Sequence, residues 1–166
     1  EHDMLSQLDC DKFNRFLQKH KSIMLIKMHY YESDKITFHS VNELSHIHLL
    51  NSQVINDINR ILHHIDVLIT DYSGVFYDFL VLDRPIIFAP FDKEKYLKND
   101  REFYFNYNEV TPGPHANNWE EILEYIEKFI HNPKLYEKER LKVMNRFNIF
   151  TDSKNCQRVF SAINKN

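Results

Sequence analysis

Residues 67–80 have the sequence VLITDYSGVFYDFL: an apolar run, a polar corner, and a second apolar run with a different spacing. The first run has the length of a buried strand. Apolar residues after the corner recur every three or four positions, as on one face of a helix. A strand, a corner and a helix form the repeating unit of α/β folds, in which ligands bind beyond the carboxyl ends of parallel strands. The stretch therefore predicts an α/β fold with a binding site at the corner.

The corner contains one of only two glycines in the chain, Gly74; the other is Gly113. Average usage would give roughly a dozen glycines in a chain of this length, so each position specifies something local. A helix N-terminus presents unpaired backbone N–H groups to an anion, and a glycine there lets a phosphate come close to the backbone. The pattern around Gly74 thus predicts a phosphate site.

Polar residues surround Gly74 on both sides. Thr70, Asp71 and Ser73 are candidate helix caps. Asp78 follows Gly74 by four residues on nearly the same helix face, where its carboxylate could accept hydrogen bonds from a ribose or polyol hydroxyl. Two interpretations are equally compatible with these residues. One is a ligand-binding site, and the other is an ordinary capped helix with a solvated Asp78.

The rest of the chain alternates strand and helix patterns without internal repeats, which predicts a parallel, doubly wound sheet. The expected strands are 23–28, 47–50, 67–69 and 85–89, and the expected helices are 5–17, 54–64, 75–82, 119–130, 133–146 and 153–163. Pro133 would occupy the first turn of its helix. The aromatic run FYFNY at 103–107 is either a strand packed into the core or a surface on which a base stacks.

Length and composition narrow the class of protein. A chain of 166 residues with 43% hydrophobic residues can bury a substantial core, so we expect one domain over 1–166. The net charge of −3 disfavours a nucleic-acid partner, because no global positive field exists to displace counterions. Cys10 and Cys156 lie far apart, which is typical of reduced thiols in cytoplasmic chains, and no apolar run reaches the roughly 20 residues of a membrane span. The chain begins without Met, so we expect a cytoplasmic domain taken from a longer protein; peripheral contact with the inner face of the cell membrane stays open.

His46 and His48 would share a face if their segment forms a strand, and such a pair can contribute to a metal site. No third ligand is close in the sequence. Solvated or hydrogen-bonded histidines are therefore the favoured interpretation, and we expect neither a metal nor another cofactor.

Four segments, in the same order, resemble motifs of the CDP-glycerol glycerophosphotransferases. LITDYSGVFYDFL (68–80), with PIIFAPFD (85–92) after it, is similar to the family's Thr-Asp-Tyr-Ser-Ser corner and hydrophobic, aspartate-containing helix. IKMHYYE (26–32) resembles its Lys-x-His-Pro segment, and FYFNYNEVTPGPHANNWEEI (103–122) its aromatic, Pro-Gly-Pro segment. FTDSKNCQRVFSAI (150–163) resembles its closing segment, so the resemblance covers most of residues 23–163.

The resemblance implies a Rossmann-like domain that forms the C-terminal, donor-binding half of a GT-B transferase, with the N-terminal acceptor domain missing from this chain. It implies transfer of glycerol phosphate from CDP-glycerol to a polyol-phosphate or lipid-linked acceptor, with release of CMP, in teichoic acid or capsule assembly. CDP-ribitol is an alternative donor. A nucleotide-sugar GT-B glycosyltransferase is a second interpretation, because the same helix N-terminus would hold any nucleoside diphosphate. A noncatalytic interaction domain that kept the fold is the third.

The resemblance also implies roles for individual residues, carried over by position. His29 matches the family histidine associated with the reacting diphosphate and is the expected catalytic residue, as a proton carrier or an electrostatic partner. Lys27, in the same motif, is expected to bind substrate. The other expected substrate-binding residues are Ser73 and Gly74 at the pyrophosphate, Thr70 and Asp71 in the turn, Asp78 at donor hydroxyls, Gly113 in a loop over the nucleotide, and Arg158 as a phosphate or structural partner.

Three positions differ from the family pattern. Tyr30 stands where the family has Pro after the histidine, and Gly74 replaces the second Ser of the corner, which keeps the N–H and removes a hydroxyl donor. Ser153 replaces Gly after Asp152. We expect these differences to bear on the choice of donor.

Overall fold

The strands of the protein are short and pair in parallel. The computed structural model describes residues 4–27, 45–50, 55, 57–99 and 103–164. Its strands are β1 (Met24–Ile26), β2 (Ile47–Leu49), β3 (Leu68–Thr70) and β4 (Ile86–Phe88). β1 pairs with β2, and β3 pairs with β4. The predicted α/β fold with parallel strands is confirmed, although the pairing among described residues forms two two-stranded sheets instead of one continuous sheet.

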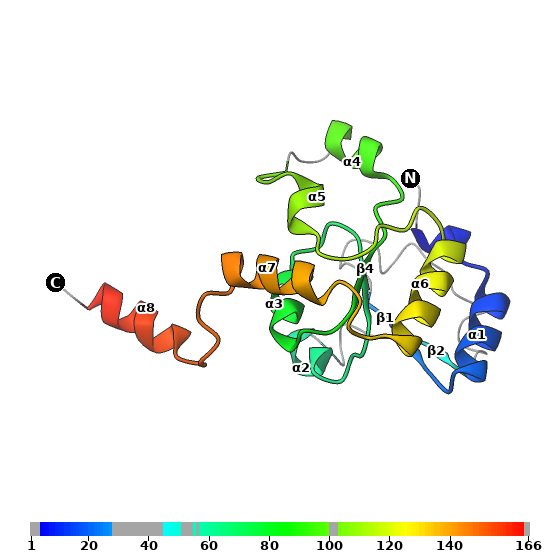
Figure 1. The fold of residues 1–166 in the computed structure, drawn as a ribbon, viewed down its shortest axis with the longest axis horizontal. Helices are drawn as coiled ribbons and strands as arrows, with labels where there is room; N and C mark the ends of the chain where they lie inside the picture. The colour runs from blue at the N-terminus through cyan, green and yellow to red at the C-terminus, as the bar shows by residue number, and fades with distance from the viewer. Residues whose placement is uncertain (1–3, 28–44, 51–54, 56, 100–102, 165–166) are drawn as a thin grey trace.

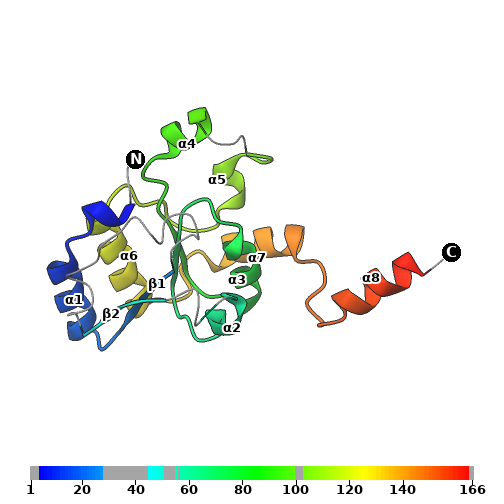
Figure 2. The same cartoon turned by 180° about the vertical axis from the view of Figure 1, so that it is seen from behind.

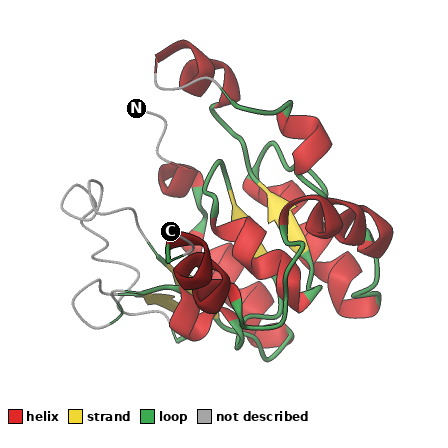
Figure 3. Cartoon of the chain, turned by 90° about the vertical axis from the view of Figure 1, so that its left-hand side faces the viewer, coloured by secondary structure: helices red, strands yellow, loops and turns green. Residues whose placement is uncertain are grey.

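Helices cover both faces of the strands (Figure 1). On one side lie α1 (Cys10–Lys19) and α6 (Trp119–His131); on the other lie α2 (Asn59–Leu62), α3 (Val75–Phe79) with its 3-10 extension η3 (Leu80–Leu82), and α7 (Glu137–Phe147). Figure 2 shows the same two groups from behind, and Figure 3 shows the strands enclosed by helices. Helices on both faces are the arrangement that a doubly wound fold requires.

Strand β4 contributes side chains to both cores, one on each face of the strands. Ile86 and Phe88 belong to the core beneath α3 and α7, whereas Ile87 belongs to the core beneath α1 and α6. Successive side chains of a strand point to opposite faces, so a continuous apolar run is needed where both faces are covered. All three residues are fully buried, as the run PIIFA predicts.

The remaining elements lie outside these two layers. They are η1 (Met4–Gln7), α4 (Lys93–Asn99), α5 (Tyr107–Val110) and α8 (Asn155–Ile163). In Figure 1, α4 and α5 lie together beyond one end of the strands, and α8 extends away from the rest of the molecule. No residue of α8 is buried, although Val159, Phe160 and Ile163 are apolar.

Three helix predictions were wrong at their boundaries. The helix expected from Pro133 begins at Glu137, because residues 133–136 form a turn that ends with Tyr136 in the left-handed region at φ 61°. The helix expected over 54–64 is the single turn α2, with 54 and 56 outside the described residues. The helix expected over 5–17 is interrupted: residues 4–7 form a 3-10 turn, and α1 begins only at Cys10. Asp9 accepts a hydrogen bond of 2.9 Å from the Lys12 N–H and is the N-cap that starts α1 there.

The strand considered for residues 103–107 is wrong. The side chain of Asn106 accepts a hydrogen bond of 3.1 Å from the Asn108 N–H and caps α5, so a helix begins inside the aromatic run. Three successive residues, Tyr104, Phe105 and Asn106, are all exposed before the buried Tyr107, which is not the alternation of a strand. The local cap determines the structure here.

The amino ends of β3 and β4 are held by arginine side chains. Arg140 is 2% exposed; its Nε donates to the Asp83 carboxylate at 2.9 Å and its guanidinium donates to the Leu135 carbonyl at 2.6 Å. Arg84 donates to the carbonyls of His63 and Ile65. A hollow of about 330 Å³ lies beside these groups. These hydrogen bonds tie the segments before β3, β4 and α7 to one another, so we call Arg140, Asp83 and Arg84 a structural joint.

We expect Asp83→Asn to lower the free energy of unfolding by about 2 kcal/mol, because it leaves the buried guanidinium of Arg140 without a counter-charge. We expect a smaller loss of stability than for a fully buried ion pair, because the Asp83 side chain is 36% exposed. Urea unfolding measures it. The matched control is Glu120→Gln, which removes an exposed partner of Lys12 and should not change stability measurably. Equal stability of the Asp83 variant and wild type would contradict the structural role of the pair.

Candidate functional site

The corner, residues 71–74, lies at the carboxyl end of β3 and immediately before α3. Asp71 Oδ1 accepts a hydrogen bond of 3.1 Å from the Ser73 N–H, and Ser73 Oγ accepts one of 3.4 Å from the Val75 N–H. The side chains of Asp71 and Ser73 therefore shape the turn. None of the three predicted caps is the N-cap of α3, because that position is Gly74 and it has no side-chain cap hydrogen bond. Asp71 and Ser73 are both exposed, so the same polar groups face solvent.

Gly74 occupies an open position at this corner. Its φ of −65° is accessible to any residue, and a Cβ atom built on it would meet nothing within 4 Å in the described part of the chain. Within the same residues, the Gly74 N–H donates to no acceptor. No contact among the described residues therefore requires a glycine at this position. Close approach of a ligand to the backbone would require one.

Gly113 is explained by packing. A Cβ atom at this position would clash with the carbonyl oxygen of Ile86 and lie 3.4 Å from the ring of Phe88. The chain around it runs along β4: the Phe88 N–H donates to the Pro114 carbonyl, and the Ala116 N–H donates to Phe88. The glycine allows this segment to lie against the strand, and a role beside the nucleotide stays a prediction.

Two of the remaining predicted site residues lie next to the corner. Thr70 is the buried last residue of β3, and Asp78 is exposed on α3 one turn beyond Gly74. Lys27 directly follows β1, which pairs with β2. The structure thus brings Thr70 and Asp78 to the corner, and the substrate-binding role of Lys27 stays a prediction. His29 lies outside the described residues, and its catalytic role stays a prediction.

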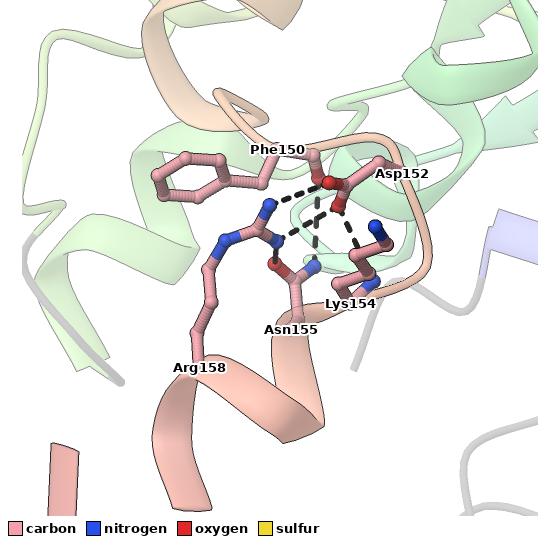
Figure 4. Close-up of polar contacts among 5 residues, drawn as sticks. All are labelled: Phe150, Asp152, Lys154, Asn155 and Arg158. Carbon is pink, nitrogen blue, oxygen red and sulfur yellow. Dashed lines mark hydrogen bonds and ion pairs between the residues drawn. The ribbon is translucent and has the colours of Figure 1, made fainter. Parts of the chain in front are cut away.

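Arg158 lies on α8, which extends away from the corner (Figure 1). Its guanidinium donates two hydrogen bonds to Asp152, at 2.8 and 2.6 Å, and lies 4.0 Å from the ring centre of Phe150 (Figure 4). Hydrogen bonding to Arg158 lowers the pKa of Asp152 to about 2. Arg158 therefore pairs with a carboxylate, and the structure does not bring it to the corner.

Residues 152–154 form a turn before α8, although Ser153 stands where the family pattern has glycine. Ser153 has a φ of 57°, in the left-handed region that glycine adopts readily. The Asp152 carboxylate accepts a hydrogen bond of 3.2 Å from the Lys154 N–H across this turn. The Asp-Ser sequence thus forms the kind of turn that Asp-Gly would form.

Sequence reasoning missed the residues that hold the corner in place. The Tyr107 hydroxyl donates to the Asp71 carbonyl at 2.8 Å, and the Tyr72 hydroxyl donates to the Asp92 carboxylate at 2.9 Å. These bonds join the corner to α5 and to the loop after β4. A tyrosine inside the corner motif was the available signal, because a buried phenol usually has a hydrogen-bond partner.

We expect both phenols to stay protonated at pH values where free tyrosine ionises. Burial, followed by the hydrogen bond to Asp92, raises the pKa of Tyr72, and burial, followed by the charge of Asp71, raises that of Tyr107. Stability is then complete below about pH 10 and falls as the pH rises, because the unfolded chain releases these protons first.

Unfolding free energies measured between pH 9 and 11 test this expectation. The decline with pH should be shallower in Tyr72→Phe and in Tyr107→Phe than in the wild type. Tyr104→Phe, which alters a fully exposed side chain, should leave the decline unchanged. Identical slopes in all four proteins would contradict the raised pKa values.

The histidine pair does not form a metal site in the described residues. His46 Nδ1 lies 2.8 Å from the Ser22 carbonyl oxygen, which gives this ring a structural partner. Across the described ranges, no three His, Cys, Asp or Glu side chains gather closely enough to hold a metal ion. None of the helices in these ranges has the length and apolar character needed to cross a membrane.

Parallel strands covered on both faces by helices, with a polar corner after β3, form a GT-B-like α/β domain. Comparison with known families matches residues 1–165 to the family described as CDP-glycerol:poly(glycerophosphate) glycerophosphotransferase. The chain belongs to this family.

The names of individual relatives agree with this family assignment. The chain is 38% identical over 106 residues to a teichoic acid poly(glycerol phosphate) polymerase of Bacillus spizizenii, covering 64% of this chain and 26% of the relative. It is 30% identical over 145 residues to a teichoic acid glycerol-phosphate transferase of Staphylococcus aureus, covering 86% and 35%. It is 27% identical over 121 residues to the ribitol-phosphate polymerase TarK of Staphylococcus aureus, covering 73% and 23%. The chain thus spans about a third or less of these relatives' lengths.

Solved structures give the same result. The wall teichoic acid polymerase TagF superimposes with a TM-score of 0.75 at 27% identity, over 93% of this chain and 36% of that one. A variant of TagF soaked with CDPG gives a TM-score of 0.76, over 95% and 37%.

Proposed function

We propose that this chain is the donor-binding domain of a glycerophosphotransferase that moves glycerol phosphate from CDP-glycerol to a polyol-phosphate or lipid-linked acceptor. The observation that carries the proposal is Gly74, which follows β3 at the corner: a Cβ atom there would meet nothing within 4 Å, and its N–H donates to no acceptor among the described residues. The family membership and the relatives' names indicate which ligand would occupy that space.

In this proposal the corner binds the pyrophosphate of the donor. The Gly74 N–H and the Ser73 hydroxyl donate to phosphate oxygens, and the carboxylate of Asp78 accepts hydrogen bonds from donor hydroxyls. α3 has only five residues, so individual N–H groups contribute more than a helix dipole does. An acceptor hydroxyl attacks the distal phosphorus, its proton leaves to a base such as His29, and the donors at the corner stabilise charge on the departing CMP.

The partners follow from the same proposal. The acceptor would be bound by a second domain that faces this one in the complete enzyme, and assembly of teichoic acid or capsule would place the enzyme at the inner face of the cell membrane. CDP-ribitol is the second candidate donor, because the chain also matches a protein named as a ribitol-phosphate polymerase.

Calorimetry with CDP-glycerol, CDP-ribitol and a UDP-sugar tests the proposal. We expect binding of a CDP-polyol and a loss of about 1 to 2 kcal/mol of its binding free energy in Ser73→Ala, which removes one donor to an anion. Ser161→Ala, the same change on exposed α8, is the matched control and should bind as the wild type does. Preference for the UDP-sugar would favour a glycosyltransferase, and no binding of any nucleotide would leave an interaction domain.

A further inference from the structure

An aromatic cluster of four rings includes one residue of the corner. It consists of Tyr72 from the corner itself, Tyr96 from α4, Phe103 from the segment between α4 and α5, and Tyr107 from α5. Tyr72 stacks on Tyr96 with ring centres 4.1 Å apart, Tyr96 on Phe103 at 5.6 Å, and Phe103 on Tyr107 at 5.3 Å. Tyr72 is also 5.8 Å from both Phe103 and Tyr107, so the four rings close on one another.

Tyr107 is the fixed member of this cluster. It is 5% exposed, the Lys93 ammonium lies 4.8 Å from its ring centre, and its ring meets Phe88 of β4 edge to face at 6.2 Å. Held in this way, its hydroxyl has a fixed position, from which it donates to the Asp71 carbonyl at 2.8 Å. A hydrogen bond from a rigid donor to a backbone carbonyl restrains that peptide unit.

The restrained peptide units are those that lead to the phosphate-binding groups. Asp71 and Tyr72 are the two residues directly before Ser73 and Gly74, and each is tied to an element outside the corner, Asp71 to α5 and Tyr72 to Asp92. Each tyrosine hydroxyl already donates its single proton to the protein, so neither can donate a hydrogen bond to a phosphate. Their contribution to binding would therefore be indirect.

We propose that Tyr107 and Tyr72 are positioning residues that hold the corner in its ligand-binding shape before the donor arrives. The inference rests on the proposed function, since it assigns a purpose to the rigidity of the same corner. A corner that is already in place loses less conformational entropy when the donor binds, and this difference appears as affinity. The chemical class of ligand is the diphosphate of a CDP-polyol.

The first test measures binding of CDP-glycerol and cytidine to Tyr107→Phe and Tyr72→Phe. Each change keeps the ring and removes one hydroxyl, so we expect CDP-glycerol to bind about 3- to 10-fold more weakly, as for the loss of one hydrogen bond. Cytidine carries no phosphate and should bind as it does to the wild type. Tyr125→Phe, on α6 in the other core, is the matched control and should leave both affinities unchanged.

A double variant separates positioning from a general loss of stability. If Tyr107 acts through the corner, Tyr107→Phe should weaken CDP-glycerol binding by less in a Ser73→Ala background than in the wild type. Equal, additive losses, or equal loss of cytidine binding, would overturn the inference. Unchanged binding in Tyr107→Phe together with weakened binding in Ser73→Ala would overturn it too and leave the proposed function intact.

Hydrogen exchange tests the inference without a ligand. In Tyr107→Phe the amides of residues 72–75 should exchange faster than in the wild type, while those of β1 and α6 keep their rates. Unchanged exchange at the corner would overturn the inference even if no nucleotide binds, a result that would separately refute the proposed function.

Discussion

Gly113→Ala should lower the free energy of unfolding by about 3 kcal/mol or more. The added Cβ would clash with the Ile86 carbonyl oxygen, a backbone atom of β4 that cannot rotate away. Relief would require the segment that pairs with Phe88 to move, with loss of its hydrogen bonds to the strand. Overpacking of this kind costs about 1 to 3 kcal/mol even when the obstacle is a side chain.

Gly74→Ala is the matched control for this prediction. Its Cβ would enter open space at a helical φ, so its stability should equal or exceed that of the wild type by up to about 1 kcal/mol. Urea unfolding of both variants measures the difference. If Gly113→Ala were as stable as Gly74→Ala, residues 111–116 would not lie against β4 as described.

The 166-residue chain should bind a CDP-polyol and transfer almost nothing. In a GT-B enzyme the acceptor is positioned by the facing domain, and orientation of two reactants accounts for roughly 7 to 11 kcal/mol of a catalysed barrier. Release of CMP in the presence of a polyol-phosphate acceptor should therefore be at least about 10⁵-fold slower than in an enzyme with the length of the relatives.

The affinity for CDP-glycerol provides the control for this comparison. It should be similar in the short chain and in the longer enzyme, because the corner and its supports all lie within the 166 residues. Acceptor-dependent release of CMP by the short chain at a rate near that of the longer enzyme would show that one domain suffices for catalysis.

The sequence was most informative where a single local pattern decides the structure. Strand β4 and the corner were predictable, because a continuous apolar run before Pro90 and a polar turn before a helical stripe each have one favoured interpretation.

The errors arose where contacts between distant residues, or competing local caps, decide the outcome. Residues 103–107 have the aromatic content of a strand, yet the cap at Asn106 starts a helix and Tyr107 turns toward Asp71, 36 positions away. Arg158 matched a motif, but no periodicity reveals that α8 extends from the body and that Asp152 holds its guanidinium. Likewise, the packing that requires Gly113 depends on Ile86 and is invisible in the residues beside it.

The joint formed by Arg140, Asp83 and Arg84 at the amino ends of the strands shares no side chain with the tyrosine bonds at their carboxyl ends. Distant sites without shared partners usually make additive contributions. Directed evolution for heat tolerance can therefore randomise residues 63–66, 83–85 and 133–140, while selection for a new substrate randomises residues at the carboxyl ends of the strands. The two selections can be carried out separately, and the substitutions that each one yields can be combined in one gene.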